Sequence, residues 1–187
     1  SGENKSKTFC EMKIFVIRHG ETDMNKARRI QGQTEDTELN ATGLAQAQAS
    51  IAVLPAGLTL CISSPLKRAR QTAEIIAKHF NVPIVFRDEL KEKHYGSLSG
   101  KTREEIMKIT EHANDLNLAV DLVEYGGESV QDVKDRLLRF FEEIKHTYPQ
   151  EVPLIVTHTG IIRFIHLMLK GHEIAEIANA SVHEFEI

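Results

Sequence analysis

The sequence predicts an α/β fold, a three-layer sandwich in which a mostly parallel central sheet is flanked by helices. Two observations predict it. Short apolar runs rich in β-branched residues alternate along the chain with longer segments of helical periodicity, as they do in βαβ units. No linker rich in Pro, Gly or Ser divides the 187 residues, and this length suits one domain.

Four apolar segments are expected to be strands of a covered sheet, because they are continuous runs without the polar alternation of a half-exposed strand. They are the segments 13–17 (KIFVI), 58–63 (LTLCIS), 83–86 (PIVF) and 153–157 (PLIVT). A fifth segment, 181–187 (SVHEFEI), alternates between apolar and polar residues and is expected to close the sheet.

Helix start signals lie between these strands. We place N-cap residues at Asn40, Ser64, Thr102 and Ser129. The expected helices cover about 40–54, 64–80, 104–110, 129–148 and 160–170. The buried face of the first helix is expected to carry Leu44, Ala47, Ile51 and Leu54. The sequence GGES at 126–129 indicates a turn followed by the Ser129 cap. The stretch from about 93 to 127 shows no clear pattern and is interpreted as a lid or loop excursion.

Bulk composition narrows the class of protein. A hydrophobic fraction of 41% and a charged fraction of 27% are typical of a globular protein. No apolar run is long enough for a membrane span, and residues 1–11 lack the apolar middle of a secretory signal, so we expect a cytoplasmic protein without a membrane partner. Those residues are expected to be a tail, either native or partly tag-derived. The net charge of −4 disfavours nucleic acid as a partner.

Polar side chains follow each predicted parallel strand, at the edge where open α/β sheets bind their ligands. Arg18 and His19 follow the first strand, and Arg68 lies in the first helical turn after the second. Glu92 comes a few residues after the third strand, and His158 directly follows the fourth. Because these strand ends meet at one edge, the sequence predicts an anion site that contains a nucleophile and an acid.

These residue types suit phosphoryl transfer. The planar fork of arginine matches the non-bridging oxygens of a phosphoryl group. A histidine ring nitrogen can attack phosphorus to form a phosphohistidine, and a carboxyl group can protonate the departing alkoxide and later activate water. We expect Gly20 to let the backbone approach the phosphate oxygens. This chemistry calls for no metal and no cofactor.

Other chemistries fit the sequence less well. The segment 96–102 (GSLSGKT) resembles a P-loop, but three residues instead of four separate Gly96 from Gly100. A cysteine phosphatase needs an arginine six positions after its cysteine, but the residue six positions after Cys61 is Lys67. The sequence contains no H-E-x-x-H motif, which would indicate a zinc site. A phosphate-recognition module without turnover remains an alternative, although both a nucleophile and an acid are present.

Six stretches between residue 12 and about residue 163 match a known family in the family's order. They are VIRHGETDMN, LNATGLAQA, SSPLKRARQTA, LKEKHYGSLSG, GGES and VTHTGIIR. With these stretches the chain resembles the phosphoglycerate mutase-like branch of the histidine phosphatase superfamily. The resemblance implies a phosphoglycerate mutase-like fold and a single histidine phosphatase domain over 12–187 with a short lid at about 93–128.

The resemblance also implies roles for individual residues. His19 is similar to the family's phosphorylated nucleophile, and Arg18, Arg68 and His158 are similar to the pocket that holds the phosphate oxygens. Glu92 matches the proton donor of this branch, because the position after the second histidine, where the other branch has its donor Asp, is Thr159 here. The further candidates for phosphate or substrate binding are Asn25, Gln31, Gly32 and Thr159.

Two departures from the family bear on the reaction. Thr159 stands where relatives often have Gly or Asn, so its β-branched side chain is expected to crowd the pocket. Between Gly100 and Gly126 the chain lacks the long insertion with which phosphoglycerate mutases enclose their substrate. A mutase must shield its phosphoenzyme from water. We therefore predict a phosphomonoester hydrolase for small phosphorylated metabolites, such as sugar phosphates or phosphoglycerates, with a mutase-type phosphotransferase as the alternative.

Basic residues cluster near the predicted site, and two interpretations are open. They form either a positive rim for a substrate with a second acidic group or a solvated basic loop. The residues are Lys26, Arg28, Arg29, Lys91, Lys93 and Lys101.

Overall fold

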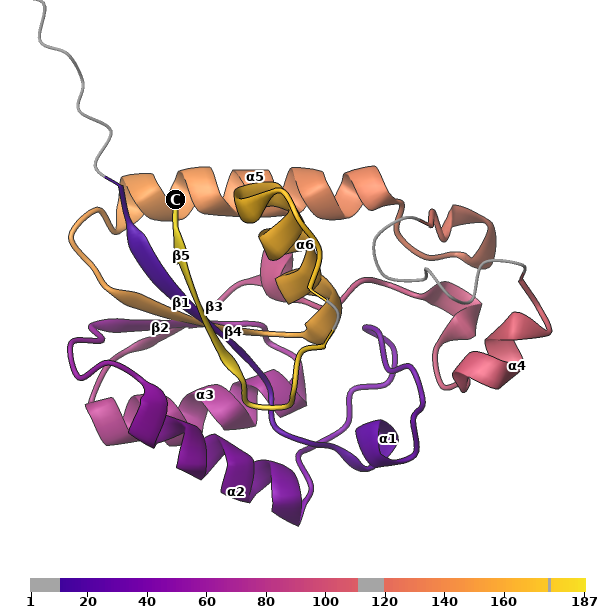
Figure 1. The fold of residues 1–187 in the computed structure, drawn as a ribbon, viewed down its shortest axis with the longest axis horizontal. Coiled ribbons are helices and arrows are strands. Elements are labelled where there is room, and N and C mark those ends of the chain that lie inside the picture. The colour runs from indigo at the N-terminus through magenta and orange to yellow at the C-terminus, as the bar shows by residue number, and fades with distance from the viewer. Residues whose placement is uncertain (1–10, 111–119, 175) are drawn as a thin grey trace, which may run out of the picture.

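The computed structural model describes residues 11–110, 120–174 and 176–187 and confirms the predicted α/β sandwich (Figure 1). Within these residues the sheet has the strand order β3-β2-β4-β1-β5. The first four strands are parallel, and β5 runs antiparallel to β1 at the edge. The strands are β1 (Lys13–Arg18), β2 (Leu60–Ser63), β3 (Ile84–Phe86), β4 (Pro153–Thr157) and β5 (Val182–Glu186).

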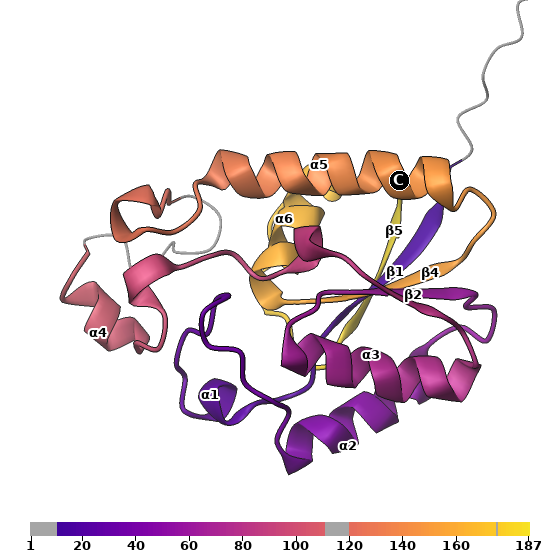
Figure 2. The ribbon, with the colours of Figure 1, turned by 180° about the vertical axis from the view of Figure 1, so that it is seen from behind.

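Helices cover both faces of the sheet, α2 and α3 on one side and α5 and α6 on the other (Figures 1 and 2). The α-helices are α1 (Asp23–Lys26), α2 (Ala41–Ser50), α3 (Lys67–Phe80), α4 (Arg103–Met107), α5 (Val130–Thr147) and α6 (Thr159–Lys170). Short 3-10 turns are η1 (Ile51–Val53), η2 (Asp88–Leu90), η3 (Gly96–Leu98) and η4 (Val123–Tyr125). No helix of the described residues has the length and apolarity to cross a membrane.

The two helical layers explain why the strand sequences are continuous apolar runs. In β1, Ile14 and Val16 pack into the core beneath α5 and α6, whereas Phe15 and Ile17 pack into the core beneath α3. Because side chains of a strand alternate between faces and both faces are covered, every position of the strand favours an apolar residue. Burial on both sides leaves the polar residues to the strand ends, where the site forms.

Three of the four predicted helix caps are confirmed, and one is wrong. Asn40, Thr102 and Ser129 each accept a hydrogen bond from the backbone N–H three residues later. Ser64 does not cap α3, which begins at Lys67. The N–H of Ser64 donates to the Val156 carbonyl of β4 at 3.0 Å, so Ser64 extends the pairing of β2 with β4, and the helix begins three residues later.

The start of α3 is stabilised from a distant loop instead. The N–H of Lys67 donates to Asp36 Oδ1 at 2.7 Å, which satisfies one of the donors that a helix N-terminus leaves open. The predicted buried face of α2 is also wrong at Leu44, which is 44% exposed, although Ala47 and Leu54 are buried. The buried face of α2 consists of Gly43, Ala47 and Ser50 instead, because Gly43 packs against the backbone of Glu21.

Gly20 serves a purpose that the sequence did not indicate. A Cβ atom on Gly20 would lie 2.3 Å from the carbonyl oxygen of Gly43, and one on Gly43 would lie 2.1 Å from the carbonyl oxygen of Glu21. The turn after β1 therefore touches the first turn of α2 backbone to backbone. This packing contact is a separate reason for glycine at position 20, and the expected approach of its backbone to phosphate stays a prediction.

The segment proposed as a lid is partly described and has a small core of its own. The residues that form this core are Tyr95, Leu98, Ile106 and Leu122, all buried. It carries η3, α4 and η4 to one side of the sandwich (Figure 1). Residues 111–119 of the predicted lid and 1–10 of the predicted tail lie outside the described residues.

Candidate active site

The strand order places the polar residues that follow β1, β2 and β4 next to one another. Strand β4 lies between β1 and β2, so His158 is flanked by His19 on one side and Ser64 on the other. The N–H of His19 donates to the Thr157 carbonyl at 3.0 Å, which extends the ladder by one residue. The His19 and His158 ring centroids are 5.1 Å apart. These polar side chains therefore converge at the carboxyl ends of the parallel strands, as predicted.

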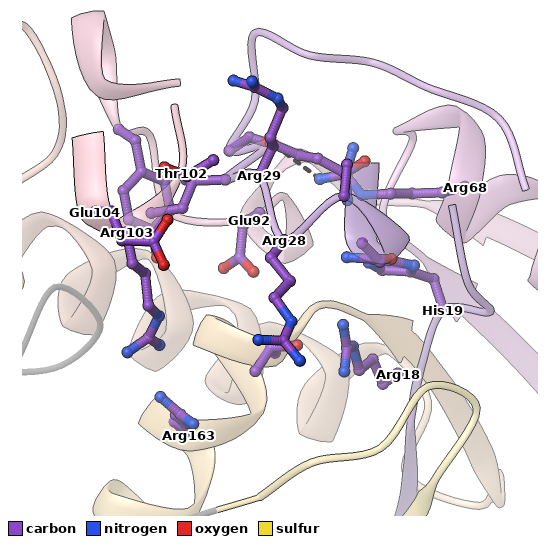
Figure 3. A pocket seen from close by; sticks show the side chains of 17 residues that line it. Arg18, His19, Arg28, Arg29, Arg68, Glu92, Thr102, Arg103, Glu104 and Arg163 are labelled. Carbon is purple, nitrogen blue, oxygen red and sulfur yellow. Dashed lines mark hydrogen bonds between the residues drawn. The ribbon is translucent and has the colours of Figure 1, made fainter. Parts of the chain in front are cut away.

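A cavity of about 460 Å³ opens at this edge (Figure 3). All the predicted site residues except His158 line it, and the His158 ring lies close to His19. The predicted residues in the lining are Arg18, His19, Asn25, Gln31, Gly32, Arg68, Glu92 and Thr159. The cavity thus joins the candidate nucleophile, two cations and the candidate acid.

Hydrogen bonding determines which nitrogen of His19 carries the proton. Nδ1 lies 2.7 Å from the Gly20 carbonyl oxygen, which can only accept, so Nδ1 is the protonated nitrogen of the neutral ring. Nε2 therefore holds the lone pair. Burial, and then the charges of Arg68 and Arg18, lower the pKa of His19 well below its ordinary 6.5. The imidazole is therefore neutral at neutral pH, as attack on phosphorus would require.

Arg18 and Arg68 are each held by backbone carbonyls. Arg18 Nη1 donates to the Ile177 carbonyl at 2.6 Å, and Arg68 Nη2 donates to the Gly32 carbonyl at 2.7 Å. Burial lowers the pKa of each guanidinium to about 10, which leaves both charged at neutral pH. The Nε atoms of both are buried without a hydrogen-bond partner among the described residues. Buried donors in this state suit an anionic ligand.

Ser64 orients the second histidine. Ser64 Oγ and His158 Nε2 are 2.8 Å apart, and both side chains are fully buried. Burial and then the Arg68 charge lower the pKa of His158 well below 6.5. Ser64, expected only to cap a helix, thus positions a ring beside the candidate nucleophile.

Glu92 reaches the cavity from the segment after β3 and is fixed by backbone donors. Its Oε1 accepts from the Lys93 N–H at 2.9 Å and its Oε2 from the Gly160 N–H at 3.1 Å. A Cβ atom on Gly160 would lie 2.4 Å from Glu92 Oε1, so the carboxylate occupies space that a larger residue would fill. Figure 3 shows the Glu92 carboxyl group facing the cavity, across Arg28 from His19.

A largely buried ion pair holds the Glu92 segment in place. Arg136 of α5 donates through Nε to Glu128 Oε1 at 2.9 Å, and it also donates to the carbonyls of Glu89 and Glu92. Glu128 Oε2 accepts from the His94 N–H at 2.8 Å. The glutamate of GGES therefore connects helix α5 to the two ends of the Glu92 segment.

The comparisons with known proteins agree with this geometry. Residues 14–187 match the model of the histidine phosphatase superfamily, branch 1. The chain belongs to the histidine phosphatase superfamily.

Relatives within this superfamily cover most of the chain. It is 35% identical over 159 residues to "Uncharacterized phosphatase PhoE" of Bacillus subtilis, with 84% of this chain and 77% of that protein covered. It is 37% identical over 185 residues to "Metal-independent phosphoserine phosphatase" of Arabidopsis thaliana, with 91% and 74% covered. The solved mycobacterial glucosyl-3-phosphoglycerate phosphatase in complex with VO3 is similar with a TM-score of 0.81 and 28% identity, with 92% and 90% covered.

The rim of the histidine phosphatase site differs from the expected one. Arg28 and Arg29 line the cavity, whereas Lys26 and Lys101 do not. Lys93 is fully buried and its Nζ donates to the Val120 carbonyl at 2.6 Å, so it braces the lid segment instead. Lys91 pairs with Asp88 at 3.1 Å.

Two lining arginines escaped the sequence analysis. Arg163 lies four residues after Thr159 on α6, a spacing that places both on one helix face and could have revealed it. Arg103 opens the short helix α4, and nothing local in the sequence indicates that this helix faces the cavity. Among the described residues, no cluster of three His, Cys, Asp or Glu side chains could hold a metal ion.

The lowered pKa values can be measured directly. We expect two histidine ring signals in an NMR titration to keep the neutral chemical shift as the pH falls through 6.5, because burial and two arginines disfavour the charged ring. His19→Ala and His158→Ala assign these signals by removing one each. Ordinary titration of either ring near pH 6.5 would contradict this electrostatic description.

Proposed function

We propose that this protein is a metal-independent phosphomonoesterase that transfers the phosphoryl group of a small phosphorylated metabolite first to His19 and then to water. The observation that carries the proposal is the state of His19. Its Nδ1–H is engaged by the Gly20 carbonyl at 2.7 Å, which leaves Nε2 to attack phosphorus between two arginines. The family, shown by residues 14–187, supports the same conclusion.

In the first step His19 Nε2 forms a bond to phosphorus while the bond from phosphorus to the ester oxygen breaks. The two guanidinium groups of Arg18 and Arg68 stabilise the charge on the non-bridging oxygens. Glu92 in its protonated form gives its proton to the departing oxygen, so the alcohol leaves neutral and Glu92 becomes a carboxylate. His158, held by Ser64, lies beside the attacking ring, with the two ring centroids 5.1 Å apart.

In the second step water attacks the phosphohistidine. The Glu92 carboxylate accepts a proton from the water, the bond between phosphorus and Nε2 breaks, and inorganic phosphate is released. The ring returns to its neutral form with the proton still on Nδ1, where the Gly20 carbonyl keeps it. The enzyme thus returns to its starting state, with the proton of Glu92 and the Nδ1 proton of His19 both in place.

Access of water favours hydrolysis over mutase chemistry. Arg28 and Arg103, which line the outer part of the cavity, are exposed, so solvent reaches the site. A phosphohistidine open to water is short-lived, whereas a mutase must preserve it. Two relatives named above are phosphatases for phosphoserine and for glucosyl-3-phosphoglycerate, both small phosphorylated metabolites.

We further propose that residues 12–187 form one catalytic domain with residues 93–128 as its lid.

Phosphate release from p-nitrophenyl phosphate and a panel of metabolite esters tests the proposal. We expect turnover that EDTA does not reduce, and His19→Ala should lower kcat/KM at least about a thousandfold because the nucleophile is lost. The matched control is His146→Ala, an exposed histidine on α5, which should keep the activity of the original protein. Activity retained in a folded His19→Ala protein, or strict dependence on a metal, would refute the proposal.

Glu92→Gln tests the acid separately. For alkyl phosphates, whose alkoxide needs a proton, we expect kcat/KM to fall by about 10²–10⁴. For p-nitrophenyl phosphate, whose leaving group scarcely needs one, the loss should be far smaller. We compare kcat/KM because it reports only the steps up to phosphoenzyme formation. Equal losses on both substrates would assign Glu92 to substrate positioning instead.

A further inference from the structure

Arginine is concentrated in the outer part of the cavity, beyond the groups that hold the transferring phosphoryl group. Arg28, Arg103 and Arg163 line this part (Figure 3). Figure 3 places Arg103 and Arg163 on the opposite side of Glu92 from His19, with Arg28 between the two groups. The three residues come from the turn after α1, the start of α4 and the middle of α6, so three separate segments bring cations to one place.

Arginines outnumber acidic side chains in the described lining of the cavity. Of the described residues that line the cavity six are arginines, whereas only Glu92 and Glu104 are acidic. Arg29 is the exception among the rim arginines, because it turns to the Gly100 carbonyl at 2.7 Å and to Glu105 at 3.2 Å. Within the described residues the side chains of Arg28 and Arg103 make no hydrogen bond and no ion pair. Cations gathered in a cleft repel one another until an anion binds.

The backbone at Arg28 adds an independent observation. The N–H of Arg29 donates to the Met24 carbonyl at 2.9 Å and that of Arg28 to the Asn25 carbonyl at 3.0 Å, which is the Schellman arrangement at the end of α1. Arg28 occupies its left-handed position with φ of 54°, where glycine is the usual residue. The chain thus accepts a strained backbone at a position whose side chain enters the cavity.

We propose that Arg28, Arg103 and Arg163 form a second anion subsite, which binds a carboxylate or a second phosphate group on the alcohol part of the substrate. Glu92 protonates the oxygen of that alcohol, so the alcohol lies on the Glu92 side of the phosphoryl group, toward the three arginines. The preferred substrates are then phosphomonoesters with an acidic leaving group. This inference rests on the phosphomonoesterase activity proposed above.

The test compares substrates that differ by one acidic group. 3-Phosphoglycerate and glycerol 3-phosphate differ only by a carboxylate in place of a hydroxymethyl group, and fructose 1,6-bisphosphate carries one phosphate more than fructose 6-phosphate. We expect kcat/KM to be at least about tenfold higher for the acidic member of one pair, since a charge-assisted hydrogen bond contributes about that factor. The pair with the larger ratio identifies the group that binds.

Arg28→Gly should reduce this ratio about tenfold, mainly through a higher KM for the acidic substrate. The matched control is Asn81→Gly, because Asn81 at the end of α3 has nearly the same left-handed backbone, with φ of 53°, and lies outside the cavity. Asn81→Gly makes the same backbone change and should leave the ratio as it is. Arg103→Gln provides a second variant, at a residue whose side chain makes no hydrogen bond within the described residues, and it should also lower the ratio.

The outcomes separate the subsite from the activity. Ratios near one for both pairs, with normal hydrolysis of p-nitrophenyl phosphate, would overturn the subsite and leave the proposed function intact. A high ratio that persists in both Arg28→Gly and Arg103→Gln would overturn the assignment to these arginines. Absence of phosphate release from every ester, p-nitrophenyl phosphate included, would overturn the proposed function and the subsite with it.

Discussion

The contact on which the site depends is the hydrogen bond from His19 Nδ1 to the Gly20 carbonyl, because it determines which ring nitrogen can attack. The Gly20 peptide is itself held firmly. Its N–H donates to Thr72 Oγ1 at 3.1 Å, and Thr72 Oγ1 donates to the Arg68 carbonyl at 2.8 Å. The turn that carries the proposed nucleophile is therefore connected to the helix that carries Arg68, which we propose binds the phosphoryl group, and the close packing of this turn against Gly43 allows little movement.

The other side of the site is organised by groups that do not line the cavity. Arg136 and Glu128 form a largely buried pair that ties α5 to the backbone around Glu92. Leaving either charge unpaired in such surroundings is costly, so the pair is held together and the segment keeps one position. Glu92 can then sit against the Gly160 N–H at the start of α6, the helix that directly follows His158. The proposed nucleophile and the proposed acid thus approach the cavity from opposite sides on rigid supports.

Much of the architecture could be predicted because it follows from local patterns. The strands, the caps at Asn40, Thr102 and Ser129, and the convergence of His19, Arg68 and His158 all follow from periodicity and from the polar residues after each strand. What failed depends on contacts between distant segments. Ser64 continues the ladder beside β4 and meets His158, Gly20 meets α2, and Lys93 turns into the lid segment. The residues next to Ser64, Gly20 and Lys93 in the sequence do not indicate which distant segments these three residues contact.

The central claim is that His19 carries the phosphoryl group during turnover. The most direct measurement is mass spectrometry of the protein quenched within seconds of mixing with a phosphomonoester that it hydrolyses, with the modified residue located by peptide fragmentation under conditions that preserve phosphohistidine. The account predicts one added phosphoryl group on His19, which decays as phosphate is released and is absent in His19→Ala. Phosphate release without an adduct, or with the adduct on another residue, would contradict it.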